Sequence, residues 1–258
     1  MLTAEPHKII VGNSCLRHRF NLWDYESTSL KISEILDFQL GDHFTHAYDQ
    51  YEKYCISNNI EHSITRISGK DQQSKSILSS LGFLSIETTY EISCRVKNLK
   101  NINAKDHRNK TLGTECNISD LQSLASSIFD YGRFSEDVLI GKELANKRYG
   151  HWAKQLYESG MPRKFLFSKD QLIGFMFYDV QGSEVKLILG GLSRIYSHLG
   201  QKFWSQVFLS IPSDHMIKTS ISANNLGVLN LYSRFGFNFN NSLVGYHKKW
   251  SSNESIIY

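Results

Sequence analysis

The segment at residues 225–237, NLGVLNLYSRFGF, contains a tyrosine that could act as a proton donor in a reaction. Tyr232 lies near the end of a helix-patterned stretch, four residues before Gly236. A phenol with a pKa of about 10 is protonated at neutral pH and can donate its proton to a leaving group. The segment therefore allows two interpretations. Tyr232 is the proton donor of an acyl-transfer enzyme, or it belongs to an apolar helix stripe formed by Val228, Leu231, Tyr232 and Phe235.

Two further segments of the second half could offer backbone N–H groups to a ligand. Gly190 and Gly191 fall near the end of a strand-like run at residues 183–192, where glycines let a strand bulge and part from its neighbour. A glycine pair at a strand end is equally often a simple turn. A helix then begins near Gly200, and helix N-termini attract phosphate through free N–H groups and the helix dipole. The candidate cradle consists of Ser197, His198, Leu199, Gly200, Gln201 and Lys202.

Metal-binding patterns are sparse in the sequence. His43 and His46 form an H-x-x-H pair on a predicted helix, but no third ligand is spaced to complete a zinc site. Neither a zinc knuckle nor a redox pair is formed by the four cysteines, which are Cys15, Cys55, Cys94 and Cys116. We therefore expect no metal.

The composition is that of a folded protein rather than a disordered one. A hydrophobic fraction of 41% with 12% aromatic residues is sufficient for a packed core in a chain of 258 residues. The net charge is only +4 and no dense Lys/Arg stripe occurs, so nucleic acid is a weak candidate partner. No run approaches the roughly 18–20 apolar residues that cross a bilayer. The N-terminus lacks a signal-peptide pattern, so we expect no membrane and a cytoplasmic location.

The pattern of apolar residues predicts a mixed α/β chain in two halves. In the first half we expect helices at residues 29–39, 44–59 and 70–82, and strands at residues 61–68 and 83–96. Residues 97–113 are polar and rich in Asn and Lys, with almost no apolar periodicity. We therefore expect an N-terminal half at residues 1–98, a linker at 99–113 and a second domain at 114–258.

The second half begins with two helices and then changes to strands. Ser119 and Gln122 predict a capping box for the first helix, and residues 141–159 predict the second. Strands at residues 164–168, 171–180 and 183–192 follow. A helix at 199–211, a strand at 216–222, a helix at 224–235 and a closing strand pair at 236–240 and 243–250 complete the chain. Three consecutive strands before one crossover helix require a sheet that starts antiparallel and finishes parallel.

A short internal echo links the two halves. Residues 74–92 and 228–248 each read as a helix, a Gly-Phe pair and a strand, with Gly82 and Gly236 in corresponding places. Such an echo is either coincidence or a structural duplication. In the second case the N-terminal half is a degenerate copy, because Leu78 or Ser79 stands where Tyr232 stands. The chemistry would then reside in the C-terminal copy.

The order of elements and the segment 225–237 resemble the Gcn5-related N-acetyltransferase (GNAT) superfamily. The matching signature is Asn225, Tyr232, Gly236 and Phe237. The stretches RFSED and LANKRYGHW resemble the branch that acylates dTDP-amino-dideoxyhexoses, through Arg133, Phe134, Asp137, Ala145, Tyr149 and Trp152. The pyrophosphate loop of the superfamily departs here, because Ile195 and His198 replace its first two signature residues and only Gly200 remains. The resemblance covers nearly the whole chain.

This resemblance implies a fold and a set of roles. The fold would be a C-terminal mixed sheet with splayed central strands flanked by helices, plus a smaller, degenerate GNAT-like N-terminal half. Tyr232 would protonate the departing thiolate of coenzyme A, help that is typically worth ~10²–10⁴ in rate. Coenzyme A would contact Asn225 and the strand end at Gly190, Gly191 and Leu192, with its pyrophosphate on residues 197–202.

For each acceptor-binding residue that the same resemblance implies, a purely structural role is the alternative. Arg133 would bind the diphosphate, or form a surface ion pair. The aromatic rings of Phe134, Tyr149 and Trp152 would line or stack on the thymine, although burial in the core is the expected fate of at least two of them. Asp137 and Glu136 are the acidic residues nearest the branch motif. Each is either a carboxylate that contacts the acceptor or assists its amine as a base through water, or a solvated loop residue.

The sequence thus predicts an acyl-CoA-dependent N-acyltransferase that acts on the amine of a dTDP-linked amino-dideoxy sugar in bacterial surface polysaccharide (O-antigen or capsule) synthesis. Acetyl-CoA is the default donor and 3-hydroxybutanoyl-CoA the second option; the amine is on C3 or C4. The N-terminal half would shape the acceptor pocket or a homodimer contact. The rivals are a peptide or polyamine N-acetyltransferase, and a non-catalytic binding module of the same fold that the eroded glycine loop favours.

Overall fold

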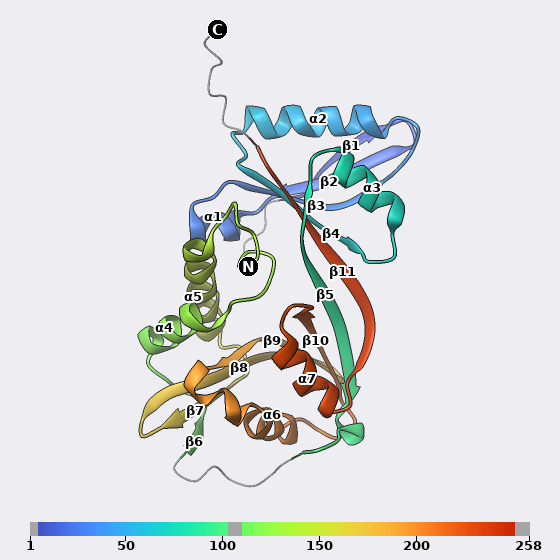
Figure 1. Cartoon of the computed structure of the whole chain (residues 1–258). Helices are drawn as coiled ribbons and strands as arrows, with labels where there is room; N and C mark the ends of the chain where they lie inside the picture. The colour runs from blue at the N-terminus through green and yellow to red at the C-terminus, as the bar shows by residue number, and fades with distance from the viewer. Residues whose placement is uncertain (1–4, 103–109, 251–258) are drawn as a thin grey trace. The chain divides into compact units, whose positions relative to one another are not determined.

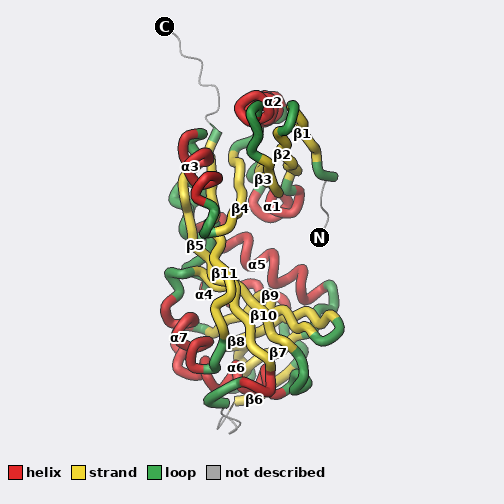
Figure 2. The backbone as a smooth tube through the Cα atoms, turned by 90° about the vertical axis from the view of Figure 1, so that its right-hand side faces the viewer, coloured by secondary structure: helices red, strands yellow, loops and turns green. Residues whose placement is uncertain are grey.

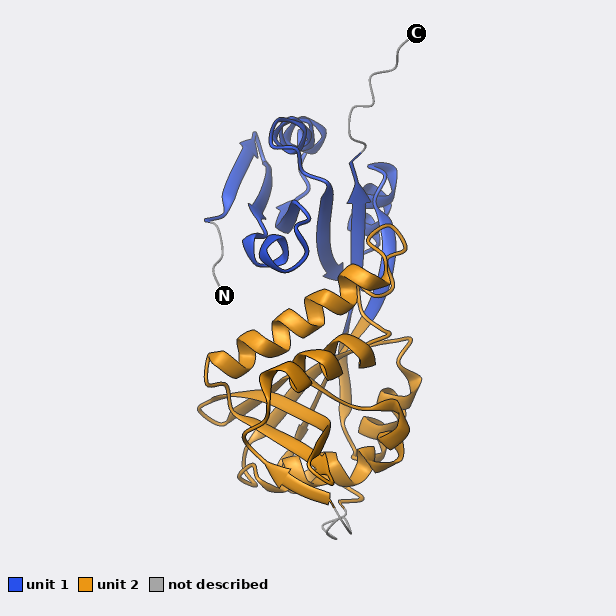
Figure 3. Cartoon of the chain, turned by 90° about the vertical axis from the view of Figure 1, so that its left-hand side faces the viewer, with its two compact units in different colours: residues 1–88, 242–258 blue, residues 89–241 orange. Residues whose placement is uncertain are grey.

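The computed structural model describes residues 5–102 and 110–250, and two compact units divide it (Figures 1 and 3). One unit comprises residues 1–88 and 242–258, and the other comprises residues 89–241. The division falls inside two long strands, β5 (Leu84–Arg95) and β11 (Asn238–Lys249), rather than in the linker expected at residues 99–113. Of that linker, residues 103–109 lie outside the described residues, and Lys110–Gly113 form strand β6.

The first unit is an α/β layer built on one sheet. Its elements are β1 (His7–Val11), β2 (Ser14–Phe20), α1 (Leu22–Thr28), β3 (Ile32–Gln39), α2 (Phe44–Ser57), β4 (His62–Ser68), α3 (Gln72–Ser80) and the start of β5. The strand order in this unit is β1-β2-β3-β4-β11. All neighbours pair antiparallel except β3 and β4, which are parallel. Helix α2 packs on β1 and β2 (Figure 2). The hydrophobic core of the first unit includes Leu16, Tyr51 and Phe83.

The helix predicted at residues 29–39 is wrong, because this segment is strand β3. Between β2 and β3 the register shifts, with Arg17 opposite Asp37 and His18 opposite Ile35, so Leu36 is an extra residue. The bulge brings Ile35 and Phe38 into the same core cluster although they are three residues apart. A spacing of three between apolar residues on one face is typical of a helix, which explains the misassignment.

The second unit contains the end of β5 and most of the remaining elements. After η1 (Val96–Asn98) and β6 they are α4 (Ile118–Ile128), α5 (Lys142–Glu158), β7 (Arg163–Ser168), β8 (Gln171–Gln181), β9 (Glu184–Leu192), η2 (Arg194–Leu199), α6 (Gly200–Leu209), β10 (Met216–Ser222), α7 (Leu226–Arg234) and the start of β11. The strand order is β6-β7-β8-β9-β10-β5, and only β9 and β10 are parallel. The predicted change from antiparallel strands to a parallel pair is confirmed at β9–β10, but the next neighbour of β10 is β5, which is antiparallel to it.

Two helical layers cover this second sheet (Figure 1). Helices α4 and α5 pack on one face against Phe165, Phe175 and Phe177. Helices α6 and α7 pack in a separate cluster that contains Met176 and Leu187. Alternate residues of β8 therefore belong to different clusters, as expected for a strand buried on both faces.

Two local predictions in this unit need correction. The expected capping box at Ser119 is absent, because the N-cap of α4 is Asn117, two residues earlier. The Asn117 side chain accepts a hydrogen bond from the Ser119 N–H at 2.8 Å. The expected closing strand pair is the single strand β11, whose twelve residues run without a turn. The polar residues at 240–242, which separate the two predicted strands, are part of β11.

The internal echo is a structural repeat. Each of β4, α3 and β5 begins and ends 154 residues before β10, α7 and β11 respectively. Asp71 and Asn225 are the N-caps of the matching helices, and each side chain accepts a hydrogen bond from the backbone N–H three residues later, at 3.0 and 3.2 Å. Gly82 and Gly236 both follow these helices with φ of 81°. The repeat extends to the parallel pairing, since β3–β4 corresponds to β9–β10.

Replacing Gly236 by alanine should destabilise the protein. A left-handed residue with a Cβ costs roughly 1–2 kcal/mol, and the added methyl would lie 3.3 Å from the Lys100 side chain. Gly227→Ala is the control, because Gly227 lies inside α7, the helix that Gly236 follows, and a Cβ there meets nothing within 4 Å. It should instead stabilise by about 0.5–1 kcal/mol through helix propensity. Urea unfolding of the three proteins measures both effects; equal values for the two variants would contradict the left-handed assignment.

Candidate functional site

The second sheet opens between its two parallel strands. β9 and β10 pair over three residue pairs only, from Glu184–Met216 to Lys186–Lys218, although both strands continue beyond them. Just past the last pair, the Thr219 hydroxyl donates to the Leu187 carbonyl at 3.3 Å. The strands therefore diverge toward their carboxyl ends. A strand edge left in this way presents backbone donors and acceptors to a ligand.

A bulge in β9 coincides with this divergence. Phe177 pairs with Leu189 and Tyr178 with Leu187, so Ile188 is an extra residue on β9. As a result Leu187 packs in the cluster of α6 and α7, whereas Leu189 packs in the cluster of α4 and α5. One inserted residue thus turns the rest of the strand over.

The glycine pair predicted to make the bulge lies beyond it. Gly190 and Gly191 remain in β9 and pair with Met176 and Phe175 of β8, so they form neither the bulge nor a turn. A Cβ at Gly191 would lie 2.6 Å from Ile128 Cδ1, and one at Gly190 would lie 2.5 Å from Met176 Cε. These glycines allow close packing of the strand, which corrects the prediction that they make the bulge or a turn. Their predicted contact with coenzyme A stays a prediction. Leu192 ends the strand and is partly buried.

Tyr232 lies inside the second unit rather than on its surface. Its side chain comes from α7, is 3% exposed and packs against Phe208 and Phe237. The hydroxyl accepts a hydrogen bond from the Trp204 indole N–H at 2.8 Å. Burial raises the pKa of the phenol well above its usual value, with the indole N–H acting weakly against that shift. The phenol is therefore protonated at neutral pH, and within the described chain it has no recorded acceptor for its own proton.

Asn225 begins the same helix. Its side-chain oxygen accepts the hydrogen bond of the Val228 N–H at 3.2 Å, so it acts as the N-cap of α7. Capping of α7 is a structural reason for an asparagine at this position of the signature. Its predicted contact with the pantetheine arm stays a prediction.

The predicted phosphate cradle has a different local structure from a simple helix start. Residues 194–199 form the 3-10 helix η2, and the N–H of Gly200 donates to the Ser197 carbonyl. Leu199 precedes α6 without a side-chain cap. Ser197 and His198 are exposed, and Gln201 and Lys202 are partly exposed at the first turn of α6. Gln201 donates to the Asn101 carbonyl at 3.0 Å.

The residues predicted to bind the acceptor cluster around one ring. Phe134 is 1% exposed, and the guanidinium carbons of Arg133 and Arg148 lie 5.4 and 4.2 Å from its ring centroid. Arg148 also lies 5.7 Å from the Trp152 ring. The structure brings Arg133, Phe134 and Trp152 together through Arg148, which sequence reasoning missed.

The remaining two predicted acceptor residues are buried. Tyr149 stacks on Phe129 at 4.5 Å and donates its hydroxyl to the Tyr131 carbonyl at 3.2 Å. Asp137 is 1% exposed and accepts from the Leu139 N–H at 2.8 Å. Phe134 and Tyr149 thus follow the alternative in which aromatic residues of this set fill the core.

Other parts of the described chain offer less. A shallow recess at the start of β7 is lined by Thr114, Gly160, Met161, Pro162, Arg163, Lys164 and Tyr178, and it contains none of the predicted site residues. Among residues 5–102 and 110–250, His, Cys, Asp and Glu side chains form no group of three that could hold a metal ion. No helix in these ranges has the length and apolarity to span a membrane.

Comparison with solved structures identifies the architecture. A functionally unknown conserved protein from Staphylococcus epidermidis superposes with a TM-score of 0.66 at 13% identity, covering 95% of this chain and 94% of that one. A GCN5-related N-acetyltransferase from Sphaerobacter thermophilus gives 0.63 at 10% identity, over 92% and 76% of the two chains. A tandem GNAT protein from the clavulanic acid biosynthesis pathway gives 0.59 at 9% identity, over 95% and 82%.

The chain has the GNAT fold. The splayed parallel strands and the bulged β9 are the parts of it that form the candidate site, and the repeat makes the chain a tandem arrangement of two such halves. No protein-family model matches the sequence, and no curated protein matches it.

Replacing Trp204 by phenylalanine tests the buried hydrogen bond. The change removes the donor to Tyr232 and leaves a buried hydroxyl with less support, which should cost about 1–3 kcal/mol of unfolding free energy. Urea unfolding of Trp204→Phe, Tyr232→Phe and the double variant forms a mutant cycle. We expect a coupling energy of about 0.5–3 kcal/mol, whereas purely additive effects would show that the two side chains do not interact.

Proposed function

We propose that this protein is an acyl-CoA-dependent N-acyltransferase whose reaction takes place in the second unit. The observation that carries the proposal is the opening between β9 and β10 in a GNAT fold, with a protonated tyrosine on the adjacent α7. The pantetheine arm of acyl-CoA carries the thioester and contains amide groups. These amides can form strand-like hydrogen bonds with the open edge of β9.

The chemistry follows from the groups of this chain. The amine of the acceptor attacks the thioester carbonyl carbon, and backbone N–H groups of β9 beyond the bulge stabilise the resulting oxyanion. The carbon–sulfur bond then breaks, and Tyr232 gives its proton to the leaving sulfur. Because Trp204 donates to the Tyr232 oxygen, it orients the phenol and stabilises the phenolate that forms. The proton lost by the amine restores the phenol through solvent.

The protein offers more suitable groups to the pantetheine arm of coenzyme A than to its pyrophosphate. The open β9 edge suits the pantetheine arm, and Lys202 at the first turn of α6 is a cation for the pyrophosphate. The N–H of Gly200 is already used inside η2, so fewer free donors remain there than at an ordinary helix N-terminus. We infer that phosphate binding relies on side chains more than on backbone.

For the acceptor we propose a nucleotide-linked amino-deoxy sugar handled in the cytoplasm. The pair of guanidinium groups at Arg133 and Arg148 beside Phe134 supports an anionic acceptor, since guanidinium suits phosphate oxygens. A cationic polyamine or peptide would instead need an acidic trough. The dTDP base, the C3 or C4 amine and a role in surface polysaccharide synthesis rest on the sequence resemblance.

A non-catalytic binding module is the second candidate. The burial of Tyr232 favours it, because a hydroxyl in a residue that is 3% exposed reaches a thioester only if the arm enters the β9–β10 opening deeply. A free-thiol release assay separates the two. Acetyl-CoA and 3-hydroxybutanoyl-CoA are supplied with dTDP-amino-deoxy sugars, polyamines or peptides. Thiol release with the sugars alone supports the proposal; silence on every acceptor supports the binding module.

Replacing Tyr232 by phenylalanine should lower kcat by about 10²–10⁴ with little change in the dissociation constant of acetyl-CoA. The ring and its packing remain, so only the proton donor is lost. Tyr246→Phe, a buried tyrosine of the first unit, is the control and should retain wild-type kcat. Near-normal turnover of Tyr232→Phe would remove this residue from the mechanism.

The repeat predicts one coenzyme site per chain. In the first unit Leu78 occupies the position of Tyr232, and a Cβ at Gly41, which follows β3, would lie 2.2 Å from Asn13 Oδ1, so that loop is tightly packed. Calorimetric titration with acetyl-CoA should therefore give a stoichiometry near one. A stoichiometry of two would show that the first unit also binds the donor.

A further inference from the structure

The segment at residues 129–136, here called the strap, is tied to the ends of both diverging strands. It follows α4, whose last residue Ile128 packs against Gly191 of β9. The strands β9 and β10 are parallel, so their carboxyl ends lie at the same edge of the sheet. The strap makes one ionic tie beyond β9 and one hydrogen-bonded tie at the end of β10.

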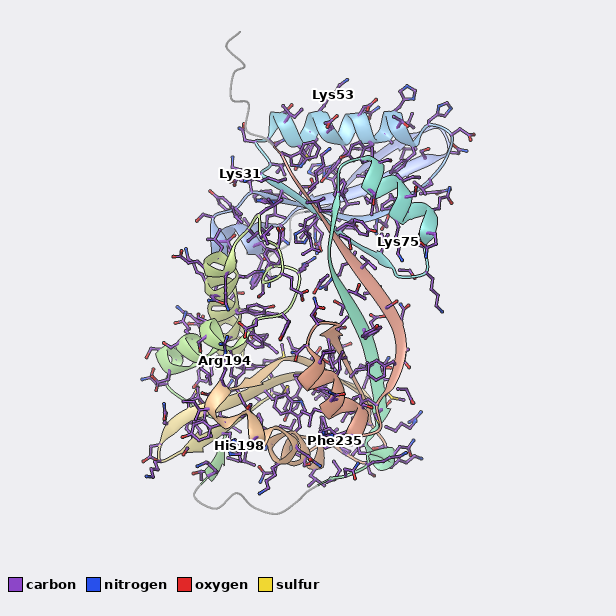
Figure 4. The ribbon with its side chains drawn as sticks, viewed as in Figure 1. Lys31, Lys53, Lys75, Arg194, His198 and Phe235 are labelled. Carbon is purple, nitrogen blue, oxygen red and sulfur yellow. The ribbon has the colours of Figure 1, made fainter. Side chains whose placement is uncertain are left out.

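The first tie is an ion pair at the start of the strap. Asp130 accepts from the Arg194 guanidinium at 2.5 and 2.7 Å and from the Lys142 ammonium at 2.6 Å. Arg194 is the first residue of η2, two residues after β9 ends, and Figure 4 labels it beside α4. The Lys142 and Arg194 side chains are largely exposed and Asp130 is partly exposed, so this tie contributes modestly to stability.

The second tie is the carboxylate of Glu136. One of its oxygens accepts from the Ser222 hydroxyl at 2.6 Å and from the Gly132 N–H at 2.8 Å, and the other accepts from the Asn224 side-chain amide. Ser222 is the last residue of β10, and Asn224 precedes the cap of α7. A single carboxylate therefore joins the Gly132 backbone of the strap to the end of β10 and to Asn224.

We propose that Glu136 is a positioning residue that holds the strap as the wall on which the acyl acceptor rests. This inference rests on the proposed function. The acyl group would lie along the open edge of β9, so the amine must approach at the carboxyl ends of β9 and β10, where the strap is fixed. Glu136 acts through the strap and not as a base, because its oxygens already accept hydrogen bonds from three donors.

Two substitutions at Glu136 distinguish a clamp from a base. Glu136→Ala removes all three hydrogen bonds and should raise the acceptor KM about tenfold, with the acetyl-CoA dissociation constant unchanged. Glu136→Gln keeps a carbonyl acceptor for Ser222 and Gly132, and the Asn224 amide can turn to pair with it. Its acceptor KM should stay within about threefold of wild type. Glu158→Ala, which breaks an exposed ion pair with Lys154 on α5, is the control.

Hydrogen exchange at the Gly132 amide gives a readout that does not depend on turnover. Exchange should rise about tenfold or more in Glu136→Ala and stay near wild type in Glu136→Gln. An equal loss of kcat in both variants with unchanged KM would identify a base and overturn the positioning role. If the wild type acylates no amine, the proposed function fails; unchanged exchange in Glu136→Ala would then separately overturn the clamp.

Discussion

The extra residue in β9 is the constraint on which the candidate site depends. A strand with strict alternation would keep Leu187 and Leu189 on one face, but the bulge at Ile188 sends them to opposite helical layers. The strand turns away from β10 at the same point, and pairing stops after Lys186. Backbone groups left unpaired inside a protein cost free energy unless another partner satisfies them. A ligand with amides of its own would be such a partner, and the pantetheine arm of the proposed donor contains amides.

The two halves carry different residues at corresponding positions of one backbone pattern. The first unit repeats the bulge at Leu36, the parallel pair, the capped helix and the left-handed glycine. It places Leu78 where the second places Tyr232. The position of Tyr232 was predictable, because the spacing from Asn225 to Gly236 is local. Its partner Trp204 was not, since their contact depends on how α6 and α7 pack across 28 residues of sequence.

Most elements of the chain could be read from apolar periodicity, and the exceptions have physical causes. The apolar pattern of strand β3 resembles that of a helix, because the bulge puts Ile35 and Phe38, three residues apart, on the same face. The polar stretch at residues 240–242 imitated a turn, yet Asn240 and Asn241 donate to side chains of β5 and continue the strand. The division into units was hidden from the sequence because it runs through strands, whose pattern does not change at the boundary.

Strands β5 and β11 also set the order in which the chain can be completed on the ribosome. In the first unit β4 takes its neighbour from residues 243–249, which are synthesised after everything else in that sheet. The edge of β4 in the first unit therefore has no β11 partner until residues 243–249 have been synthesised. Long-range pairing of this kind slows folding, and an unpaired strand edge makes a folding intermediate prone to aggregation. Removal of residues 243–249 would leave β4 of the first unit without its β11 neighbour.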